Sequence, residues 1–172
     1  VGRLETQKNH SFLLDVMRLL VDSNSQLHLA CVGDGPLKCS LMSKARELGL
    51  SLNVMWLGVR NDIPALLSAA DCFVLPSLYE GFPFSLIEAQ SEGLRCVVAD
   101  TISSQCSLTD LLTYCPLDAS VFACGIRAVL GADYSDRSHY ATTVYEAGYD
   151  IESTVDSLMN IYMGNAVNEK AY

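Results

Sequence analysis

The stretch of residues 71–99, DCFVLPSLYEGFPFSLIEAQSEGLRCVVA, has two apolar ends separated by a segment with helix signals. Its two ends, residues 71–75 and 95–99, are short apolar runs with the length of strands that are buried on both faces. Between them, Pro83 suits the first turn of a helix, and Gly93 suits its end. A strand, a helix and a second strand in this order predict a βαβ unit with parallel strands.

The rest of the chain predicts the same alternation. Further strands are expected at residues 26–32, 53–57 and 111–114. Helices are expected at residues 36–48, 63–70, 119–130, 135–147 and 151–162, after a first helix that Asn9 or Ser11 caps. We therefore predict an α/β fold, an open doubly wound parallel sheet with helices on both faces. The core spans residues 1–130 and a helical tail spans residues 131–172 of a single domain.

Two local predictions can be checked directly against a structure. The first helix has an apolar face made of Phe12, Val16, Leu19 and Leu20. Asp62 is placed to cap the helix that begins at residue 63.

Composition excludes several classes of protein. The 172 residues carry 11 Lys and Arg against 20 Asp and Glu, a net charge of −9. This balance excludes a nucleic-acid binder and argues against direct membrane contact through this segment. No run approaches the roughly 18 apolar residues of a membrane span, and nothing at the start is typical of a signal peptide. Seven cysteines without a C-x-x-C pair predict free thiols in the cytoplasm, and the three histidines have no metal-ligand spacing.

Ligands of open α/β sheets bind outside the carboxyl ends of the strands. The loops expected at that edge are residues 2–9, 33–36, 58–62, 76–83 and 100–104. Residues 33–36 either face a ligand or form a plain turn. The pair Asp100-Thr101 either contacts a ligand or simply caps. No G-x-G-x-x-G or G-x-S-x-G pattern occurs in the chain.

The first of these loops carries two cations, Arg3 and Lys8, beside a helix start. Free N–H groups at such a start already favour an anion, so the pair can bind a phosphate. The alternative is two solvated surface cations.

The loop after the strand at residues 71–75 carries Glu80, and Glu88 follows in the next helix. The two carboxylates could accept hydrogen bonds from sugar hydroxyls. The helix start adds the backbone N–H groups of Phe84, Ser85 and Leu86, which the first turn leaves without intrahelical acceptors. The alternative is that the two carboxylates only favour the helix N-terminus electrostatically.

Five motifs occur in a fixed order: GRL at residues 2–4 with QKN at 7–9, VGDGPL at 32–37, LGVRNDIP at 57–64, PSLYEGFP at 76–83 continuing to Glu88-Ala89, and Gly93-Leu94 before a strand that ends in Asp100-Thr101-Ile102. Together they resemble the C-terminal half of family 4 glycosyltransferases with the GT-B fold, over residues 1–130. The fold implied is the Rossmann-like, nucleotide-sugar-binding half. ADTIS at residues 99–103 and LTDL at 108–111 look most like the enzymes of bacterial capsular and exopolysaccharide assembly.

The resemblance implies a role for each matching position. Arg3 and Lys8 would neutralise the donor diphosphate, with Gly2 in the same donor-binding loop. Glu80 would lie at the donor sugar and complete the catalytic set, and Glu88 would bind the ribose. The backbone that meets sugar and phosphate would be that of Gly81, Phe82, Pro83, Phe84, Ser85 and Leu86, and the segment that borders the base would be Val59 and Arg60.

The activity implied is retaining transfer of a hexosyl group from a UDP- or GDP-type sugar. No metal or other cofactor is expected, because an Arg–Lys pair and a helix N-terminus can stabilise a leaving diphosphate. Arg95 stands where relatives commonly have proline.

The resemblance also implies a partner, the N-terminal acceptor domain of the parent chain, which this sequence does not supply. The sequence starts at the end of the domain's first strand, so we expect a fragment that binds donor poorly and transfers nothing. The parent would be cytoplasmic, or peripheral at the inner face of the membrane. A non-catalytic nucleotide-binding module and a sugar-nucleotide epimerase-like domain remain the alternatives.

Overall fold

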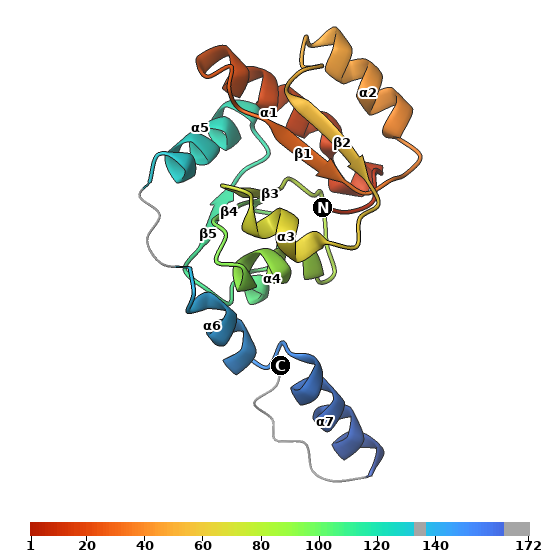
Figure 1. The fold of residues 1–172 in the computed structure, drawn as a ribbon, viewed down its shortest axis with the longest axis vertical. Helices are drawn as coiled ribbons and strands as arrows, with labels where there is room; N and C mark the ends of the chain where they lie inside the picture. The colour runs from red at the N-terminus through yellow and green to blue at the C-terminus, as the bar shows by residue number, and fades with distance from the viewer. Residues whose placement is uncertain (133–136, 164–172) are drawn as a thin grey trace.

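The computed structural model describes residues 1–132 and 137–163, and it confirms the α/β class. In chain order its elements are η1 (Thr6–Lys8), α1 (His10–Ser23), β1 (Leu29–Val32), α2 (Lys38–Glu47), β2 (Val54–Gly58), α3 (Ile63–Ser68), β3 (Phe73–Leu75), α4 (Phe84–Ser91), β4 (Cys96–Ala99), η2 (Ser104–Cys106), β5 (Leu112–Cys115), α5 (Ala119–Leu130), α6 (Tyr140–Glu146) and α7 (Ile151–Tyr162). Figure 1 shows the strands at the centre, with α6 and α7 extending away from them.

The strands are all parallel, as predicted, but their hydrogen bonds form two ladders. β1 pairs with β2, with Leu29 opposite Val54. β4 lies between β3 and β5, with Cys96 opposite both Phe73 and Leu112. A cavity of about 590 Å³, lined by β1 and β3, lies between the two ladders. The single continuous sheet of the prediction is therefore divided at this point within the described residues.

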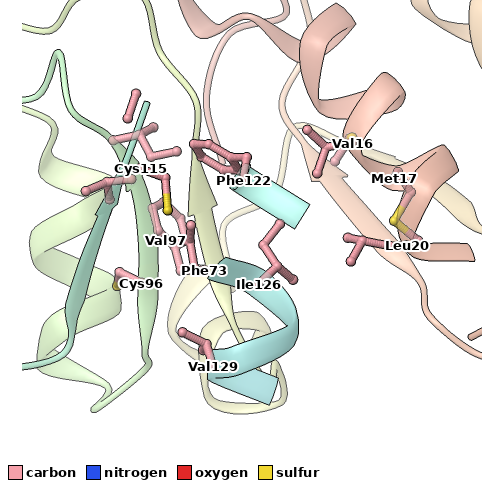
Figure 2. Packing of buried hydrophobic residues seen from close by; sticks show 14 of the residues in the cluster. Val16, Met17, Leu20, Phe73, Cys96, Val97, Cys115, Phe122, Ile126 and Val129 are labelled. Carbon is pink, nitrogen blue, oxygen red and sulfur yellow. The ribbon is translucent and has the colours of Figure 1, made fainter. Parts of the chain in front are cut away.

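The core lies where α5 packs on the strands from one side and against α1 from the other (Figure 2). Phe122 of α5 is fully buried and meets Phe12 of α1 edge to face, with ring centroids 5.5 Å apart. Gly125 lets α5 approach β5 closely, because a Cβ there would lie 2.7 Å from Cys115 Sγ. Burying a phenylalanine side chain such as that of Phe122 stabilises the fold by about 1.5–3 kcal/mol.

Three local predictions are wrong, each for a physical reason. Leu19 is 39% exposed, because α1 turns it outside the face that contacts α5. Asn9 precedes α1 but adopts a left-handed conformation with φ 52°, and its side chain makes no cap hydrogen bond. Asp62 precedes α3 without capping it, because its carboxylate binds Arg60 instead.

The tail is attached to the core by polar contacts. Arg137 Nη2 donates to Ala70 O at 3.2 Å, and Tyr140 Oη donates to Asp110 Oδ1 at 3.0 Å. The helix predicted from residue 135 begins at residue 140, and its first two predicted positions lie outside the described residues, as do residues 164–172. Within the described residues, every helix is too short or too polar to cross a membrane.

Candidate functional site

The loops after the strands are joined into one edge by close backbone contacts. Leu4 N donates to Asp34 O at 2.9 Å, and Gly33 N donates to Gly58 O at 2.7 Å. Gly33 adopts φ 129°, and a Cβ there would lie 2.0 Å from Gly2 O. Only glycine fits this position, so the loop at residues 2–9 rests directly on the end of β1.

Lys8 and Glu80 form the polar centre of this edge. Lys8 Nζ donates to Glu80 Oε1 at 2.7 Å, although the two residues stand 72 positions apart. The side chains are only 16% and 8% exposed, so this ion pair is largely withdrawn from water. Such a pair interacts more strongly than a surface pair, and either partner left alone would be unfavourable. The structure thus brings together two of the three residues predicted to be catalytic.

Gln7 holds the same two loops together and was missed by sequence reasoning. Its Nε2 donates to Tyr79 O at 2.9 Å and to Glu80 Oε2 at 3.3 Å. Its backbone oxygen accepts from Leu78 N at 2.9 Å. The one signal in the sequence was its place beside Lys8 in the QKN motif.

The helix after Glu80 starts one residue later than predicted, with Pro83 as its N-cap residue. Two of the three amides expected to lack acceptors are already paired, because Phe84 N donates to Phe82 O and Leu86 N to Pro83 O. That part of the prediction is wrong, since the tight turn at Phe82 and Pro83 supplies local acceptors.

The turn at residues 81–83 is exposed at Gly81 and packs against the tail at Phe82. Gly81 is exposed, with open space around its Cα, and Glu88 is exposed on α4. Phe82 is half-buried, and its ring stacks on Tyr149 with centroids 5.3 Å apart.

Among the remaining predicted residues, Gly2 lies against the Lys8 side chain, whereas Arg3 and Arg60 each face another carboxylate. Arg3 has a side chain 69% exposed, and its Nε lies 3.7 Å from Glu5 Oε2. Arg60 donates to both carboxylate oxygens of Asp62, at 2.8 and 2.6 Å. This contact lowers the pKa of the Asp62 carboxyl, mainly through the hydrogen bond. Val59 is 80% exposed beside it.

The pKa values of His10 and Cys106 are also shifted. Burial, assisted by the positive charges of the chain's amino terminus and Lys8, lowers the pKa of His10 to about 4. Burial, assisted by the Glu80 carboxylate, raises the pKa of the Cys106 thiol. In the described ranges, 1–132 and 137–163, no three His, Cys, Asp or Glu residues gather as ligands of a metal ion would. The edge therefore offers a cation–carboxylate pair, backbone amides and exposed polar side chains.

Comparison with known proteins identifies the family. The chain matches Glycosyl transferases group 1 over residues 1–110. It is 36% identical over 165 residues to the "Putative glycosyltransferase EpsF" of Bacillus subtilis, which covers 94% of this chain and 43% of that protein. It is 31% identical over 177 residues to the Escherichia coli protein named UDP-Gal:alpha-D-GlcNAc-diphosphoundecaprenol alpha-1,3-galactosyltransferase, covering 98% of this chain and 46% of that protein.

The fold is shared with solved structures of glycosyltransferases. A mutant of S. aureus TarM, crystallised with fondaparinux, α-GlcNAc-glycerol and UDP, matches with a TM-score of 0.80 and 20% identity over 94% of this chain and 34% of that one. The chain spans less than half the length of the two curated relatives, at 43% and 46%. The ordered motifs, the parallel α/β fold and these similarities place the chain in the glycosyl transferases group 1 family, with the fold of one half of a GT-B enzyme.

Proposed function

We propose that this chain is the donor-binding half of a retaining, hexosyl-type glycosyltransferase that uses a nucleoside-diphosphate sugar of the UDP or GDP type. One observation carries the proposal. A lysine and a glutamate from distant loops are held 2.7 Å apart, at the edge of the sheet where α/β proteins bind ligands. A cation suits a diphosphate, and a carboxylate suits sugar hydroxyls, so the pair matches both parts of such a donor.

The proposed chemistry follows from the charge that develops on the leaving group. The bond between the sugar's anomeric carbon and the diphosphate oxygen breaks, and its electrons stay on that oxygen. The oxygen of an acceptor hydroxyl then forms the new glycosidic bond on the same face, and its proton passes to the departing diphosphate. Lys8, joined by the exposed guanidinium of Arg3, would stabilise the departing diphosphate without a metal ion.

The other predicted residues receive roles that suit their positions. Glu80 would accept hydrogen bonds from the sugar hydroxyls, and the exposed Glu88 would bind the ribose. The exposed turn at Gly81 would admit the sugar and diphosphate next to the start of α4. Val59 and Arg60 would border the base.

Similarity to the relatives supports a place in bacterial surface polysaccharide assembly, capsular or exopolysaccharide. The Escherichia coli relative is named for transfer from UDP-Gal to α-D-GlcNAc-diphosphoundecaprenol. A lipid-linked acceptor of that kind would place the parent protein in the cytoplasm or at the inner face of the membrane. The acceptor would be bound by another domain of the parent chain, so the 172 residues alone would bind donor without transferring sugar.

Thermal-shift measurements with UDP, GDP, ADP, NAD and their sugar conjugates test this proposal. A ligand that binds only the folded state raises the melting temperature by mass action. We expect stabilisation by UDP or GDP and by the matching nucleotide sugars. Stabilisation by NAD alone would contradict the proposal and favour a different use of the fold.

A further inference from the structure

Gln90 is a fully buried residue of α4, and both the nitrogen and the oxygen of its side-chain amide are hydrogen-bonded. Its Nε2 donates to Cys106 O at 2.9 Å and to Leu86 O at 3.2 Å. Its Oε1 accepts from Leu108 N at 2.9 Å, and from Thr109 N and Oγ1 at 3.1 and 3.0 Å. One side chain therefore fixes the backbone of a loop at three successive points.

The loop that Gln90 holds, residues 100–110, follows β4 and lies beside the loop that carries Glu80. Thr101 Oγ1 donates to Ser77 O at 2.8 Å, which joins the two loops directly. Hydrogen bonds thus connect Gln90, through the 100–110 loop, to the loop that carries Glu80.

We propose that Gln90 is a positioning residue for the donor site, because it holds the 100–110 loop as a wall beside Glu80 against which the donor sugar is bound. This inference rests on the proposed function, since it assigns the sugar side of that same site. Hydroxyl and amide groups are the chemistry that recognises sugar hydroxyls. The loop exposes several such side chains, among them those of Ser103, Ser104, Gln105 and Ser107.

Asn53 provides a matched control within the chain. It is also a buried amide, 8% exposed, and its Nδ2 donates to Ser25 O at 3.0 Å and Leu27 O at 2.8 Å. Its contacts lie before β1 and β2, at the opposite edge of the sheet from the candidate site. Loss of this amide removes two buried hydrogen bonds to backbone oxygens without touching the 100–110 loop.

The experiment compares Gln90→Leu, Thr109→Val and Asn53→Leu with the unaltered chain. Hydrogen exchange measured by mass spectrometry, without ligand, follows residues 100–110 and 76–84. Calorimetry measures the Kd for UDP and for UDP-galactose. Thr109→Val removes only the hydroxyl that donates to Gln90 Oε1 at 3.0 Å, so it serves as the test if Gln90→Leu fails to fold.

We expect Gln90→Leu to speed exchange in both segments and to weaken UDP-galactose binding about tenfold, while the Kd for UDP stays within about twofold. Thr109→Val, which removes one of these hydrogen bonds, should give a smaller effect in the same direction. Asn53→Leu should lower the melting temperature and leave both segments and the ratio of the two Kd values unchanged.

Faster exchange confined to residues 100–110, or equal weakening of UDP and UDP-galactose, would overturn the proposal. If the unaltered chain binds neither ligand, the proposed function fails. The exchange measurement still decides whether Gln90 positions the loop that carries Glu80.

Discussion

Lys8 Nζ lies 2.7 Å from Glu80 Oε1, and this contact joins the first loop of the chain to the loop after β3. Lys8 carries three N–H donors, so it can keep one on Glu80 and direct another to a phosphate. The arrangement holds both groups in place before any ligand binds. Preorganised charge of this kind is what the proposed reaction needs.

The ion pair should contribute measurably to folding. Lys8→Met leaves the Glu80 carboxylate largely buried without its cation, and we expect the free energy of unfolding to fall by about 2 kcal/mol. The control is Lys44→Met, which removes the partner of Asp15 in a more exposed ion pair, with side chains 30% and 47% exposed, and should cost less than about 1 kcal/mol. Urea denaturation measures both. Equal losses of unfolding free energy in the two variants would show that the buried pair contributes no more to stability than the exposed pair.

Glu88 should act on the ribose alone. We expect Glu88→Ala to weaken binding of UDP and leave pyrophosphate binding unchanged, because only UDP carries a ribose. Glu92→Ala, one helical turn further along, is the matched control and should change neither. Calorimetric titration gives all four constants. An unchanged Kd for UDP in Glu88→Ala would remove this residue from the ribose.

The tail should support the donor loop through one aromatic contact. Phe82 stacks on Tyr149 with an interplanar angle of 8°. We expect Tyr149→Ala to lower stability by about 1 kcal/mol and to speed hydrogen exchange at residues 80–84. Tyr145→Ala, which removes an exposed tyrosine of α6, should leave that exchange unchanged. If Tyr149→Ala also leaves it unchanged, the stack does not hold the loop.

His10 should make stability depend on pH. Its pKa is lowered from 6.5 to about 4 in the folded state, chiefly by burial, so between these values the unfolded chain binds the extra proton. The free energy of unfolding should therefore fall as the pH drops from about 6.5 to 4, by at most about 3 kcal/mol. His10→Gln should flatten that slope, and His28→Gln, at an exposed position, should not. Denaturation at a series of pH values measures the slope. An unchanged slope in His10→Gln would contradict the prediction.

The parts of the fold that local signals control were predicted well. α5 and α7 have the predicted bounds, and each follows an aspartate that caps it, Asp118 and Asp150. The strands were less accurate at their starts. β1 begins at Leu29 rather than at residue 26, because a strand begins where its partner does, here at Val54. Pairing of that kind depends on residues distant in sequence.

The candidate site also combines features that the sequence predicts with features that depend on distant contacts. The rule that ligands bind at the strand ends was enough to place Lys8 and Glu80 at one edge. The residues that support the surrounding loops could not be predicted, since Gln7, Gln90 and Tyr149 act through contacts between segments far apart in the chain. An amide or a ring has no pattern of its own that distinguishes such a role from ordinary burial or exposure.

The central claim is that the first loop binds a diphosphate, and calorimetric titration of UDP and uridine tests it most directly. The unaltered chain and the Arg3→Ala/Lys8→Ala variant are compared for both ligands. We predict that the variant binds UDP at least about tenfold more weakly and binds uridine with unchanged affinity, because only UDP carries the charge that the two cations meet. Equal loss for UDP and uridine, or no loss for either, would contradict the account.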